Sequence, residues 1–528
     1  MTYTLTTPLY YVNDKPHLGS AYTTLACDAL ARFQRLKGER VIFITGCDEH
    51  GLKIQRTAEQ AGLTPQAHCD RVSAQYRELW QAWEISNDRF IRTTDPRHRQ
   101  LVHQFFKRVE AAGDVVEGRQ QGWYCVACEE FKDDPAGANT PNCGIHHRPL
   151  EWRDEINLFF RLSRYQQPIE ELIRRPGFIS PPGRQKEVEN FVLQGLRDFS
   201  ISRLNVPWGL PVPGHEPQTF YVWFDALLGY LTALLEPGDV PDLELLSQRG
   251  WPASVHVIGK DILRFHAVYW PAMLLSAGLP VPERVFGHGF LTREGQKMGK
   301  SLGNVLDPAT LLERCGPDAV RWYLLRDIGF GDDGDFQQQR FTDLVNNDLA
   351  NTIGNLLNRT SSMARRWFAE AVPPVSSALT DQHPLALASA DATQRVLAAL
   401  ERLDFRAAAE AALQLAVAAN GYLNEQAPWS RMKRQEGVEQ VADDLYAVLE
   451  AARIVALLIA PLLPDLAERM LAQLAQAPLA SGVPEQASSD APASPPWSER
   501  LWWGGLVAGT PLPEPAPVMA RLELEETL

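Results

Sequence analysis

Residues 6–45 read TTPLYYV, NDKPHLGS, AYTTLACDALARFQRLK, GER and VIFIT, and these stretches decide the fold. The first, residues 6–12, is apolar and aromatic, which predicts a strand covered on both faces. Residues 21–37 carry apolar side chains at helical spacing and end before Gly38, so they predict a helix. Residues 41–45 predict a second buried strand. A strand, a helix and a strand within about 40 residues form a βαβ unit, whose strands are parallel.

Length and composition limit the number of domains and the classes of protein to which the chain can belong. The chain has 528 residues, enough for three or four domains of about 150 residues. Its 51 basic and 65 acidic residues give a net charge of −14, which argues against a polybasic nucleic-acid binder but leaves room for a local basic patch. The longest apolar run, residues 454–463, is shorter than the roughly 20 residues that cross a bilayer, and no basic region precedes an apolar one at the N-terminus. We therefore expect a cytoplasmic protein without a secretory leader or a membrane span.

The alternation of strands and helices is interrupted once and later ends. Residues 116–215 are rich in Cys, Gly and Pro and predict an insertion, whereas residues 341–475 follow a helical pattern almost throughout. Residues 477–496 are rich in Ala, Pro and Ser and predict a linker. We expect an α/β fold: a Rossmann-type parallel-sheet catalytic domain with an inserted connective domain, followed by a helical domain. The expected boundaries are 1–115 and 216–290 for the two halves of the sheet domain, 116–215 for the insertion, 291–340 for a flexible catalytic loop and its surroundings, 341–475 for the helical domain, and 476–528 for a linker and tail.

The insertion contains a metal-binding pattern. Cys125 and Cys128 are two residues apart, and fourteen residues later Cys143 and His146 repeat that spacing. Three thiolates and one imidazole suit tetrahedral Zn²⁺, and a full ligand set indicates one structural ion per chain. The adjacent His147 is an alternative fourth ligand, and the competing interpretation is a set of unpaired surface thiols. An odd count of seven cysteines also argues against a disulfide framework.

Two further motifs suit a bound polyphosphate. His17-Leu18-Gly19-Ser20 lies between the first strand and its helix, where a helix N-terminus offers free N–H groups to phosphates. Lys297 and Lys300 lie in a polar loop flanked by glycines, as a mobile clamp would. Taken singly, the first motif could be a turn with an incidental histidine, and the second a solvated surface loop.

Together the two motifs resemble the double signature of class I aminoacyl-tRNA synthetases. The stretches 7–13, 47–51, 221–226 and 259–262 resemble the methionyl-tRNA synthetase family, and the resemblance runs from about residue 3 to about residue 475. Two positions depart from the family pattern. Ser20 stands where a second histidine is more frequent, and Gly299 where serine is more frequent. A serine cannot become a cation, and a glycine loosens the loop.

The resemblance implies a methionine–tRNA ligase. Such an enzyme forms methionyl-adenylate from L-methionine and ATP with Mg²⁺, and then transfers the methionyl group to the 3′ end of initiator and elongator tRNA(Met). Asp48 would face the methionine ammonium group. The implied catalytic residues are His17, Ser20, Lys297 and Lys300; the implied ATP-binding residues are His17, Gly19, Ser20, Gly259, Asp261, His288 and Lys300; the implied methionine-binding residues are Leu9, Tyr11, Asp48, Trp223, Ala226, Tyr230, Ile262 and His266.

The resemblance also gives the helical domain a role. Asn355 and Arg359 are four residues apart, hence on one helix face, and with Trp429 they match the anticodon-reading positions of the family. Without that match, Asn and Arg on a helix are usually solvated surface residues, and Trp429 could be a core residue. The family carries a zinc knuckle in its connective insertion, which fits the cysteine pattern. Nothing after residue 475 resembles the dimerisation domain of some members, so we expect a monomer.

Two other classes of protein share some of these features. A nucleotidyltransferase of another pathway also uses a His-x-Gly turn, but it needs neither a helical RNA-reading domain nor a zinc knuckle. A non-catalytic zinc-knuckle RNA-binding protein would keep the cysteines without needing Lys297 or Lys300. Methionine-driven ATP–pyrophosphate exchange separates the second class from a ligase, and tRNA-dependent release of AMP separates the first.

Overall fold

Six parallel strands form the central sheet of the computed structural model, in the order β3–β2–β1–β11–β12–β7. The order reverses between β1 and β11, and ligands bind beyond the carboxyl ends of the strands at such a point. The strands are β1 (Thr2–Tyr11), β2 (Arg40–Asp48), β3 (Arg89–Arg92), β7 (Ile179–Ser180), β11 (Val255–Gly259) and β12 (Val285–His288). The structure describes residues 2–126, 130–132, 141–144, 148–204, 206–298, 304–377, 379–479 and 496–523.

The predicted βαβ unit is confirmed. Helix α1 (Leu18–Leu36) connects β1 to β2, and the two strands are parallel neighbours. The helix begins three residues earlier than predicted, because His17 and Ser20 cap its N-terminus. Both strands are also longer than their apolar centres.

Two apolar clusters cover the sheet. One includes the buried side of α1 and of α3 (Pro65–Ala82) and continues into the C-terminal helices. The other is built from α4 (Pro96–Ala111), α7 (Val222–Thr232) and α8 (Trp270–Ser276). The sheet is therefore enclosed on both faces, and the middle of β1 and of β2 is buried.

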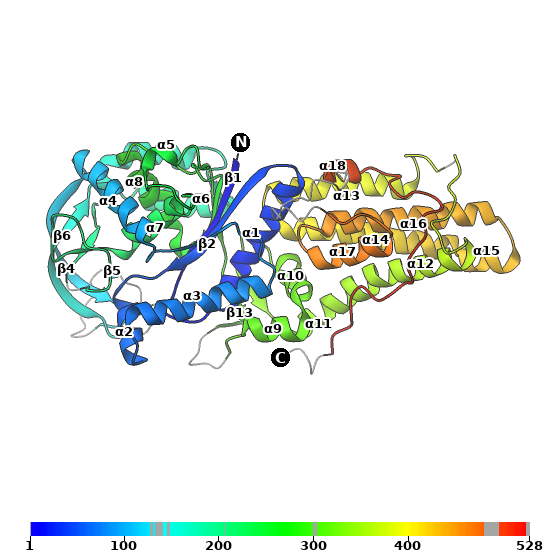
Figure 1. Ribbon diagram of the computed structural model, residues 1–528, viewed down its shortest axis with the longest axis horizontal. Helices are drawn as coiled ribbons and strands as arrows, with labels where there is room; N and C mark the ends of the chain where they lie inside the picture. The colour runs from blue at the N-terminus through cyan, green and yellow to red at the C-terminus, as the bar shows by residue number, and fades with distance from the viewer. Residues whose placement is uncertain are drawn as a thin grey trace.

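The insertion is a separate antiparallel sheet at the far end of the sheet domain (Figure 1). Its strand order is β5–β4–β6–β8, and β4 pairs with β6 along ten residues. Strand β7 also lies within residues 116–215 yet belongs to the central sheet, as the partner of β12. The elements of this region are β4 (Val115–Cys125), β5 (Glu130–Lys132), β6 (Glu151–Phe160), α5 (Gln166–Arg174), α6 (Pro182–Val192), β8 (Phe199–Ser200), β9 (Ser202–Arg203) and β10 (Thr219–Phe220).

A bundle of long helices forms the other end of the elongated molecule (Figure 1). A small sheet and short helices lie between the bundle and the central sheet. These connecting elements are β13 (Leu291–Arg293), β14 (Gln296–Lys297), α9 (Pro308–Cys315), α10 (Pro317–Arg326), β15 (Gly334–Phe336) and α11 (Gln338–Leu344). The bundle contains the π-helical segment η6 (Val345–Gly354), α12 (Asn355–Trp367), α13 (Pro384–Glu401), α14 (Phe405–Gln426), α15 (Pro428–Arg434), α16 (Val438–Ile459) and α17 (Pro464–Gln473).

The C-terminal tail packs back on the bundle. Trp497, which begins α18 (Trp497–Arg500), is buried, and its indole N–H donates to the Leu457 carbonyl at 3.1 Å. Further along, the Tyr446 hydroxyl donates to the Leu506 carbonyl at 2.7 Å. Among the described residues, no helix is both long enough and apolar enough to span a membrane.

Candidate active site

The predicted phosphate-binding turn is a helix cap. The Nδ1 atom of His17 accepts hydrogen bonds from the backbone N–H groups of Gly19 (3.1 Å) and Ser20 (3.3 Å). The Ser20 hydroxyl donates to the His17 carbonyl (2.7 Å) and accepts from the His17 N–H (3.1 Å), which completes a capping box. A Cβ atom on Gly19 would lie 3.0 Å from two ring atoms of His17, so a larger residue would crowd the ring.

This cap fixes the state of the His17 ring. Because Nδ1 accepts two hydrogen bonds, the proton of the neutral ring is on Nε2, which can donate to a ligand at the helix N-terminus. His17 is exposed at the N-terminus of α1, but neighbouring protein groups still remove part of the water around its ring. This desolvation lowers the pKa of His17 below its ordinary value, and Asp14 opposes the shift only in part. The ring is therefore a neutral donor at pH 7.

Three predicted nucleotide-binding residues lie together at the carboxyl ends of β11 and β12. A Cβ atom on Gly259 would lie 2.5 Å from Oδ1 of Asp261 and 3.9 Å from Cε1 of His288. The Nδ1 atom of His288 donates to the Gly289 carbonyl (2.8 Å), so Nε2 accepts from the hydroxyl of Thr23 (2.7 Å). Since Thr23 belongs to α1, this contact joins the nucleotide-binding group to the helix that His17 caps.

Asp48 ends β2, which flanks β1 on the side opposite to β11 and the nucleotide-binding group. It is 6% exposed, and it lies beside Tyr11 in the β1–β2 pairing. Its Oδ1 atom lies 3.4 Å from the backbone nitrogen of His50 and 3.5 Å from the hydroxyl oxygen of Thr93. Both distances are at the long end for hydrogen bonds.

The predicted methionine side-chain pocket is assembled from α7 and the segment after β11. The Tyr230 hydroxyl donates to Nε2 of His266 (2.8 Å), and Nδ1 of that ring donates to the Ile262 carbonyl (3.0 Å). The rings of Trp223 and His266 meet edge to face, with centroids 6.4 Å apart. Leu9 approaches α7 so closely that a Cβ atom on Gly229 would lie 2.4 Å from it. Ala226 is buried on α7, one turn before Tyr230.

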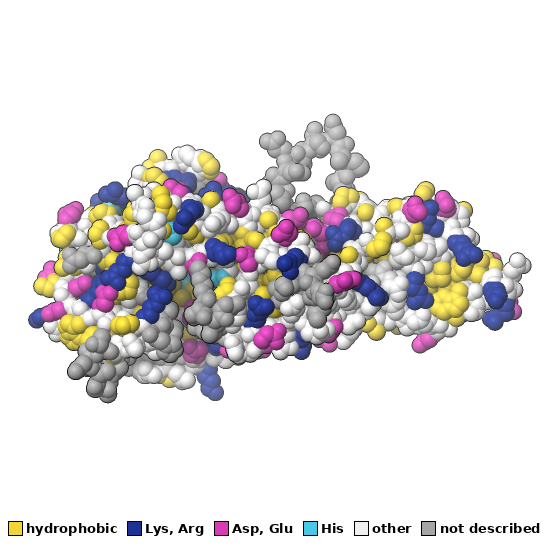
Figure 2. All heavy atoms as spheres, turned by 90° about the horizontal axis from the view of Figure 1, so that it is seen from below, with side chains coloured by type: hydrophobic (Ala, Val, Ile, Leu, Met, Phe, Trp, Pro, Cys, Tyr) yellow, Lys and Arg dark blue, Asp and Glu magenta, His cyan; other side chains and the backbone are white. Residues whose placement is uncertain are grey.

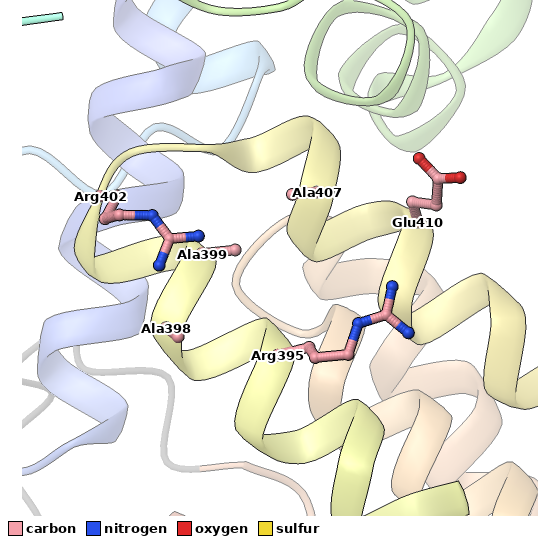
Figure 3. A pocket seen from close by; sticks show the side chains of 6 residues that line it. All are labelled: Arg395, Ala398, Ala399, Arg402, Ala407 and Glu410. Atoms are coloured by element: carbon pink, nitrogen blue, oxygen red, sulfur yellow. The ribbon is translucent and has the colours of Figure 1, made fainter. Parts of the chain in front are cut away.

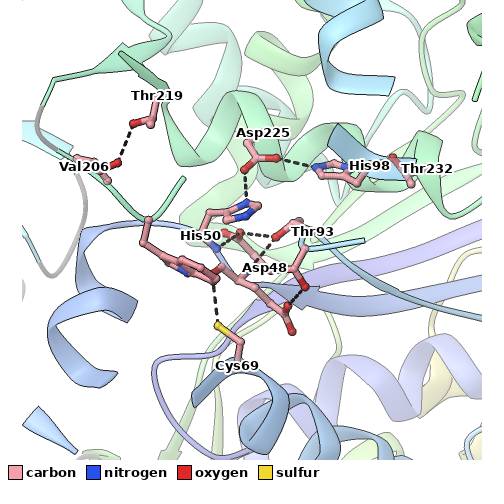
Figure 4. A network of polar contacts seen from close by, with 12 residues as sticks. Asp48, His50, Cys69, Thr93, His98, Val206, Thr219, Asp225 and Thr232 are labelled. Atoms are coloured by element: carbon pink, nitrogen blue, oxygen red, sulfur yellow. Dashed lines mark hydrogen bonds and ion pairs between the residues drawn. The ribbon is translucent and has the colours of Figure 1, made fainter. Parts of the chain in front are cut away.

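A buried network behind this pocket carried no role in our sequence analysis. The carboxylate of Asp225 contacts Nδ1 of His50 and Nε2 of His98, each at 2.6 Å (Figure 4). The Nδ1 atom of His98 continues the network to the hydroxyl of Thr232 at 2.8 Å. The signal was present, because an aspartate inside the apolar stretch 221–232 requires partners when it is buried.

The second signature motif falls mostly outside the described residues, which is where Gly299 and Lys300 lie. The backbone of Lys297 ends β14, which pairs with β13. The base of this loop lies close to the first motif, because Lys15 forms an ion pair of 2.5 Å with Asp307, the N-cap of α9.

The cysteines of the insertion are described in part. Cys125 and Cys143 are each 1% exposed and share a small apolar cluster with Leu150. The Cys143 N–H donates to the Arg148 carbonyl at 2.8 Å. Cys128, His146 and His147 lie outside the described residues. Within the described part of the chain, no group of three or more possible metal ligands is present.

At the far end of the bundle, two predicted anticodon residues meet. The guanidinium of Arg359 lies over the Trp429 ring, 5.5 Å from its centroid. Trp429 begins α15 with Pro428 and is 39% exposed, so it is not a buried core residue. Asn355 is exposed one turn before Arg359 on α12.

A shallow pocket lies elsewhere in the bundle, between α13 and α14 (Figure 3). It is lined by Arg395, Ala398, Ala399, Arg402, Ala407 and Glu410. None of these residues belongs to the groups that meet at the sheet edge, so the pocket is not part of the candidate active site.

Buried histidines make the sheet domain sensitive to acid. Burial lowers the pKa of His266 and of His288 to about 4, whereas an unfolded histidine has a pKa of 6.5. The unfolded state therefore binds more protons between these values, and stability falls as the pH falls below 6.5. We expect a loss of about 2 kcal/mol per histidine between pH 7.5 and pH 5.

Thermal and urea unfolding at both pH values measure this loss. The variant His288→Phe cannot bind the proton and should reduce the pH dependence by about one histidine's share, about 2 kcal/mol. The variant Trp502→Ala, which changes an exposed tryptophan of the tail and no titratable group, should leave it as in the wild type. A pH dependence that is the same in all three proteins would contradict the assignment.

Known protein families match the chain in two parts. A model described as tRNA synthetases class I (M) matches residues 3–148 and 134–361. A model described as the anticodon binding domain of methionyl tRNA ligase matches residues 372–490. The two matches cover the sheet domain with its insertion and most of the helical bundle.

Similar proteins match over the whole length. The methionine–tRNA ligase of Thermosynechococcus vestitus is 51% identical over 530 residues, covering 100% of this chain and 98% of the relative. That of Synechocystis sp. is 52% identical over 534 residues, covering 99% of this chain and 98% of the relative. The Mycobacterium tuberculosis methionyl-tRNA synthetase in complex with methionyl-adenylate is 39% identical with a TM-score of 0.90, over 98% of this chain and 100% of that structure. The chain therefore belongs to the methionyl-tRNA synthetase family, within the class I aminoacyl-tRNA synthetases.

Proposed function

We propose that this chain joins L-methionine to tRNA(Met) in two steps at the carboxyl ends of β1, β2, β11 and β12. In the first, the methionine carboxylate attacks the α-phosphate of ATP, and pyrophosphate leaves. In the second, a hydroxyl of the terminal tRNA ribose attacks the acyl carbon, and AMP leaves. The observation that carries this proposal is that Asp48 on β2 and the group of Gly259, Asp261 and His288 on β11 and β12 lie on opposite sides of β1, beside the switch in strand order. The contact of Thr23 with His288 joins that group to the helix that His17 caps.

Catalysis in this proposal is positioning and charge stabilisation. The neutral His17 donates from Nε2 to a phosphate oxygen, next to the free N–H groups of α1. Gly259, Asp261 and His288 hold the nucleoside, and Lys297 and Lys300 hold the pyrophosphate. Mg²⁺ bound with ATP offsets the charge of its phosphates. Ser20, whose hydroxyl is used within the cap, supports His17 and so acts indirectly.

Methionine is recognised at its two ends. Asp48 accepts the ammonium group, and the thioether lies among Leu9, Trp223 and Tyr230, with Tyr11, Ala226 and Ile262 completing the walls. The neutral His266 uses both ring nitrogens within the protein, so the pocket offers no charge to a side chain. An apolar pocket of polarisable aromatic groups suits a thioether.

The tRNA would lie along the length of the molecule. On one face, lysine and arginine side chains occur from the sheet domain to the end of the bundle, with acidic side chains between them (Figure 2). We assign residues 1–115 and 216–290 to catalysis, 116–215 to the connective insertion, 291–340 to the catalytic loop, 341–475 to the anticodon and 476–528 to the tail. We infer a cytoplasmic monomer that serves initiator and elongator tRNA.

Trp429 gives a test of anticodon recognition that spares the first step. Stacking of an unpaired base on an aromatic ring contributes about 1–3 kcal/mol, so Trp429→Ala should lower the efficiency of tRNA aminoacylation about ten- to a hundredfold. Methionine-dependent ATP–pyrophosphate exchange involves no tRNA and should stay near the wild-type rate. The control Trp502→Ala changes an exposed tryptophan of the tail and should affect neither reaction. Equal losses in both reactions would instead indicate a packing role for Trp429.

The insertion would hold one Zn²⁺ through Cys125, Cys128, Cys143 and His146. The burial of Cys125 and Cys143 in one small cluster fits such a donor set, and the bound ion would stabilise the turns of this sheet. We expect about one Zn²⁺ per purified chain. Cys143→Ser should lose the ion and lower the melting temperature of the insertion, whereas Cys315→Ser should retain it. Full retention in the Cys143 variant would exclude this ligand set.

The first step is tested by ATP–pyrophosphate exchange. Exchange should require L-methionine, and isoleucine and cysteine should not replace it. Addition of tRNA(Met) should then release AMP and yield charged tRNA. Exchange driven by another amino acid in preference to methionine would contradict the proposed substrate.

A further inference from the structure

A buried carboxylate joins the two ends of the methionine site. Asp225 lies on α7 and is 0% exposed, and each of its oxygens is used by one imidazole ring, His50 and His98, at 2.6 Å (Figure 4). The Nδ1 atom of His98 reaches the Thr232 hydroxyl at 2.8 Å, so the network returns to α7. The carboxylate therefore connects α7, α4 and the segment after β2.

Each connected segment contributes to methionine recognition or supports a segment that does. Helix α7 carries Trp223 and Tyr230, which line the side-chain pocket. His50 follows Asp48 by two residues, and its backbone nitrogen lies 3.4 Å from Oδ1 of Asp48. Asp225 thus lies between the group that would bind the ammonium and the groups that would bind the thioether.

The charge of Asp225 is required for these contacts. Burial alone would raise the pKa of its carboxyl, but the interactions with His50 and His98 outweigh burial and hold that pKa below its usual range. An ionised carboxylate accepts from both rings at once. An asparagine has the same shape but only one oxygen, and its NH₂ group would face a ring N–H, so one ring would lose its partner.

Asp48 depends on where His50 lies. Its Oδ1 atom lies 3.4 Å from the His50 nitrogen and 3.5 Å from the Thr93 hydroxyl oxygen. The same hydroxyl, which follows β3, accepts from the Glu49 N–H at 2.9 Å and so is tied to the segment after β2 that carries His50. A shift of the His50 ring would move this segment and the Asp48 carboxylate together.

We propose that Asp225 is a positioning residue, which acts through His50 to hold Asp48 at the correct distance from the aromatic pocket on α7. It does not touch the substrate. Its contribution is to the selectivity for an α-amino acid, because the ammonium and the thioether of one ligand can be bound together only when the two sites keep this separation. The inference rests on the proposed methionine site.

The test compares two ligands that differ only in the ammonium group. L-Methionine and 4-(methylthio)butanoate are titrated into the wild-type enzyme and into Asp225→Asn, with tryptophan fluorescence or calorimetry as the readout. Truncating one partner of a buried charge pair changes binding by one or more powers of ten, and an indirect effect should be smaller. We expect methionine affinity to fall about ten- to thirtyfold and affinity for the analogue to fall less than about threefold.

Two further variants separate this role from a merely structural one. His50→Ala removes the contact between His50 and Asp225, while His98 still pairs with Asp225. It should reduce the preference for methionine over the analogue to the same extent as Asp225→Asn. This variant keeps the proposal testable if Asp225→Asn folds poorly. The variant Thr232→Val removes only the outermost hydroxyl and should keep the preference within about twofold. In a cycle with Asp48→Asn, the losses caused by Asp225→Asn should be strongly less than additive.

Each other outcome overturns a defined statement. If both ligands lose affinity in parallel while the melting temperature falls, Asp225 supports only the fold. If the losses of methionine affinity caused by Asp225→Asn and by Asp48→Asn are additive, Asp225 does not act on Asp48 through His50. If the wild-type enzyme does not prefer methionine over the analogue, or catalyses no methionine-dependent exchange, the proposed function fails and the inference with it.

Discussion

Asp48→Asn should lower kcat/KM for methionine activation about a thousandfold, a loss of about 4 kcal/mol, because it leaves the ammonium of the substrate without a countercharge. The carboxylate is almost fully buried at the end of β2, where water cannot replace it. Asparagine keeps the size of the side chain and one oxygen that can accept from the His50 N–H and the Thr93 hydroxyl. Melting curves of both proteins show whether the variant folds as the wild type does.

Steady-state exchange rates at varied methionine concentration measure this loss. The same substitution at Asp239, which pairs with Arg249 at the surface, provides the matched control and should change kcat/KM less than about twofold. The analogue 4-(methylthio)butanoate should bind both proteins about equally, since it lacks the ammonium group. If the analogue lost as much affinity as methionine, Asp48 would have a role other than binding the ammonium.

The parts of the fold that follow a local pattern could be predicted from the sequence. The βαβ unit was found because residues 6–45 alternate between apolar runs and helical spacing. Strand β7 was not found, since it has two residues and no period can be seen in so short a segment. The packing of the C-terminal tail on the bundle could not be predicted from local patterns either. Trp497 reaches Leu457 forty residues away, and the prolines around it conceal any period.

In the candidate site, too, contacts within one turn could be predicted from the sequence, whereas contacts between distant segments could not. The cap at His17 is formed by residues within one turn, so the motif could be interpreted directly. His50 and Asp225 are 175 residues apart and meet only because α7 packs against β3 and α4 next to the end of β2. Their contact has no signal in one sequence beyond the presence of a charge in an apolar stretch. The family resemblance alone assigns Arg359 and Trp429 to anticodon reading, and their contact, like that of His50 with Asp225, could not be predicted from one sequence.

One local strain also escaped the sequence analysis. Ala427 has a positive φ of 43°, which is unfavourable for a residue with a Cβ atom. Pro428 follows it, and a proline disfavours the right-handed helical region for the residue before it. Helix α14 therefore stops abruptly, and α15 begins in a new direction with Trp429 partly exposed. Strain of this kind persists where the surrounding structure compensates for it, often at functional sites.

His17→Asn should slow methionyl-adenylate formation about a hundred- to a thousandfold while the KM for methionine changes little. This is the loss expected when one preorganised donor to a developing charge is removed. Asparagine is among the preferred N-cap residues, so its side-chain oxygen can accept from the N-terminal N–H groups of α1 as Nδ1 of His17 does. It cannot reach as far as Nε2 of the imidazole, and the donor to the phosphate is lost.

His17→Ala provides the matched comparison, because it removes the cap and the donor together. Loss of an N-cap costs about 1 kcal/mol, so we expect this variant to melt at a lower temperature than His17→Asn. The two variants should nevertheless show the same loss in the rate of pyrophosphate exchange, since both lack the Nε2 donor. If asparagine restored the rate as well as the melting temperature, His17 would act only by capping α1. Single-turnover rates and melting curves of the two proteins therefore separate the catalytic role of His17 from its structural one.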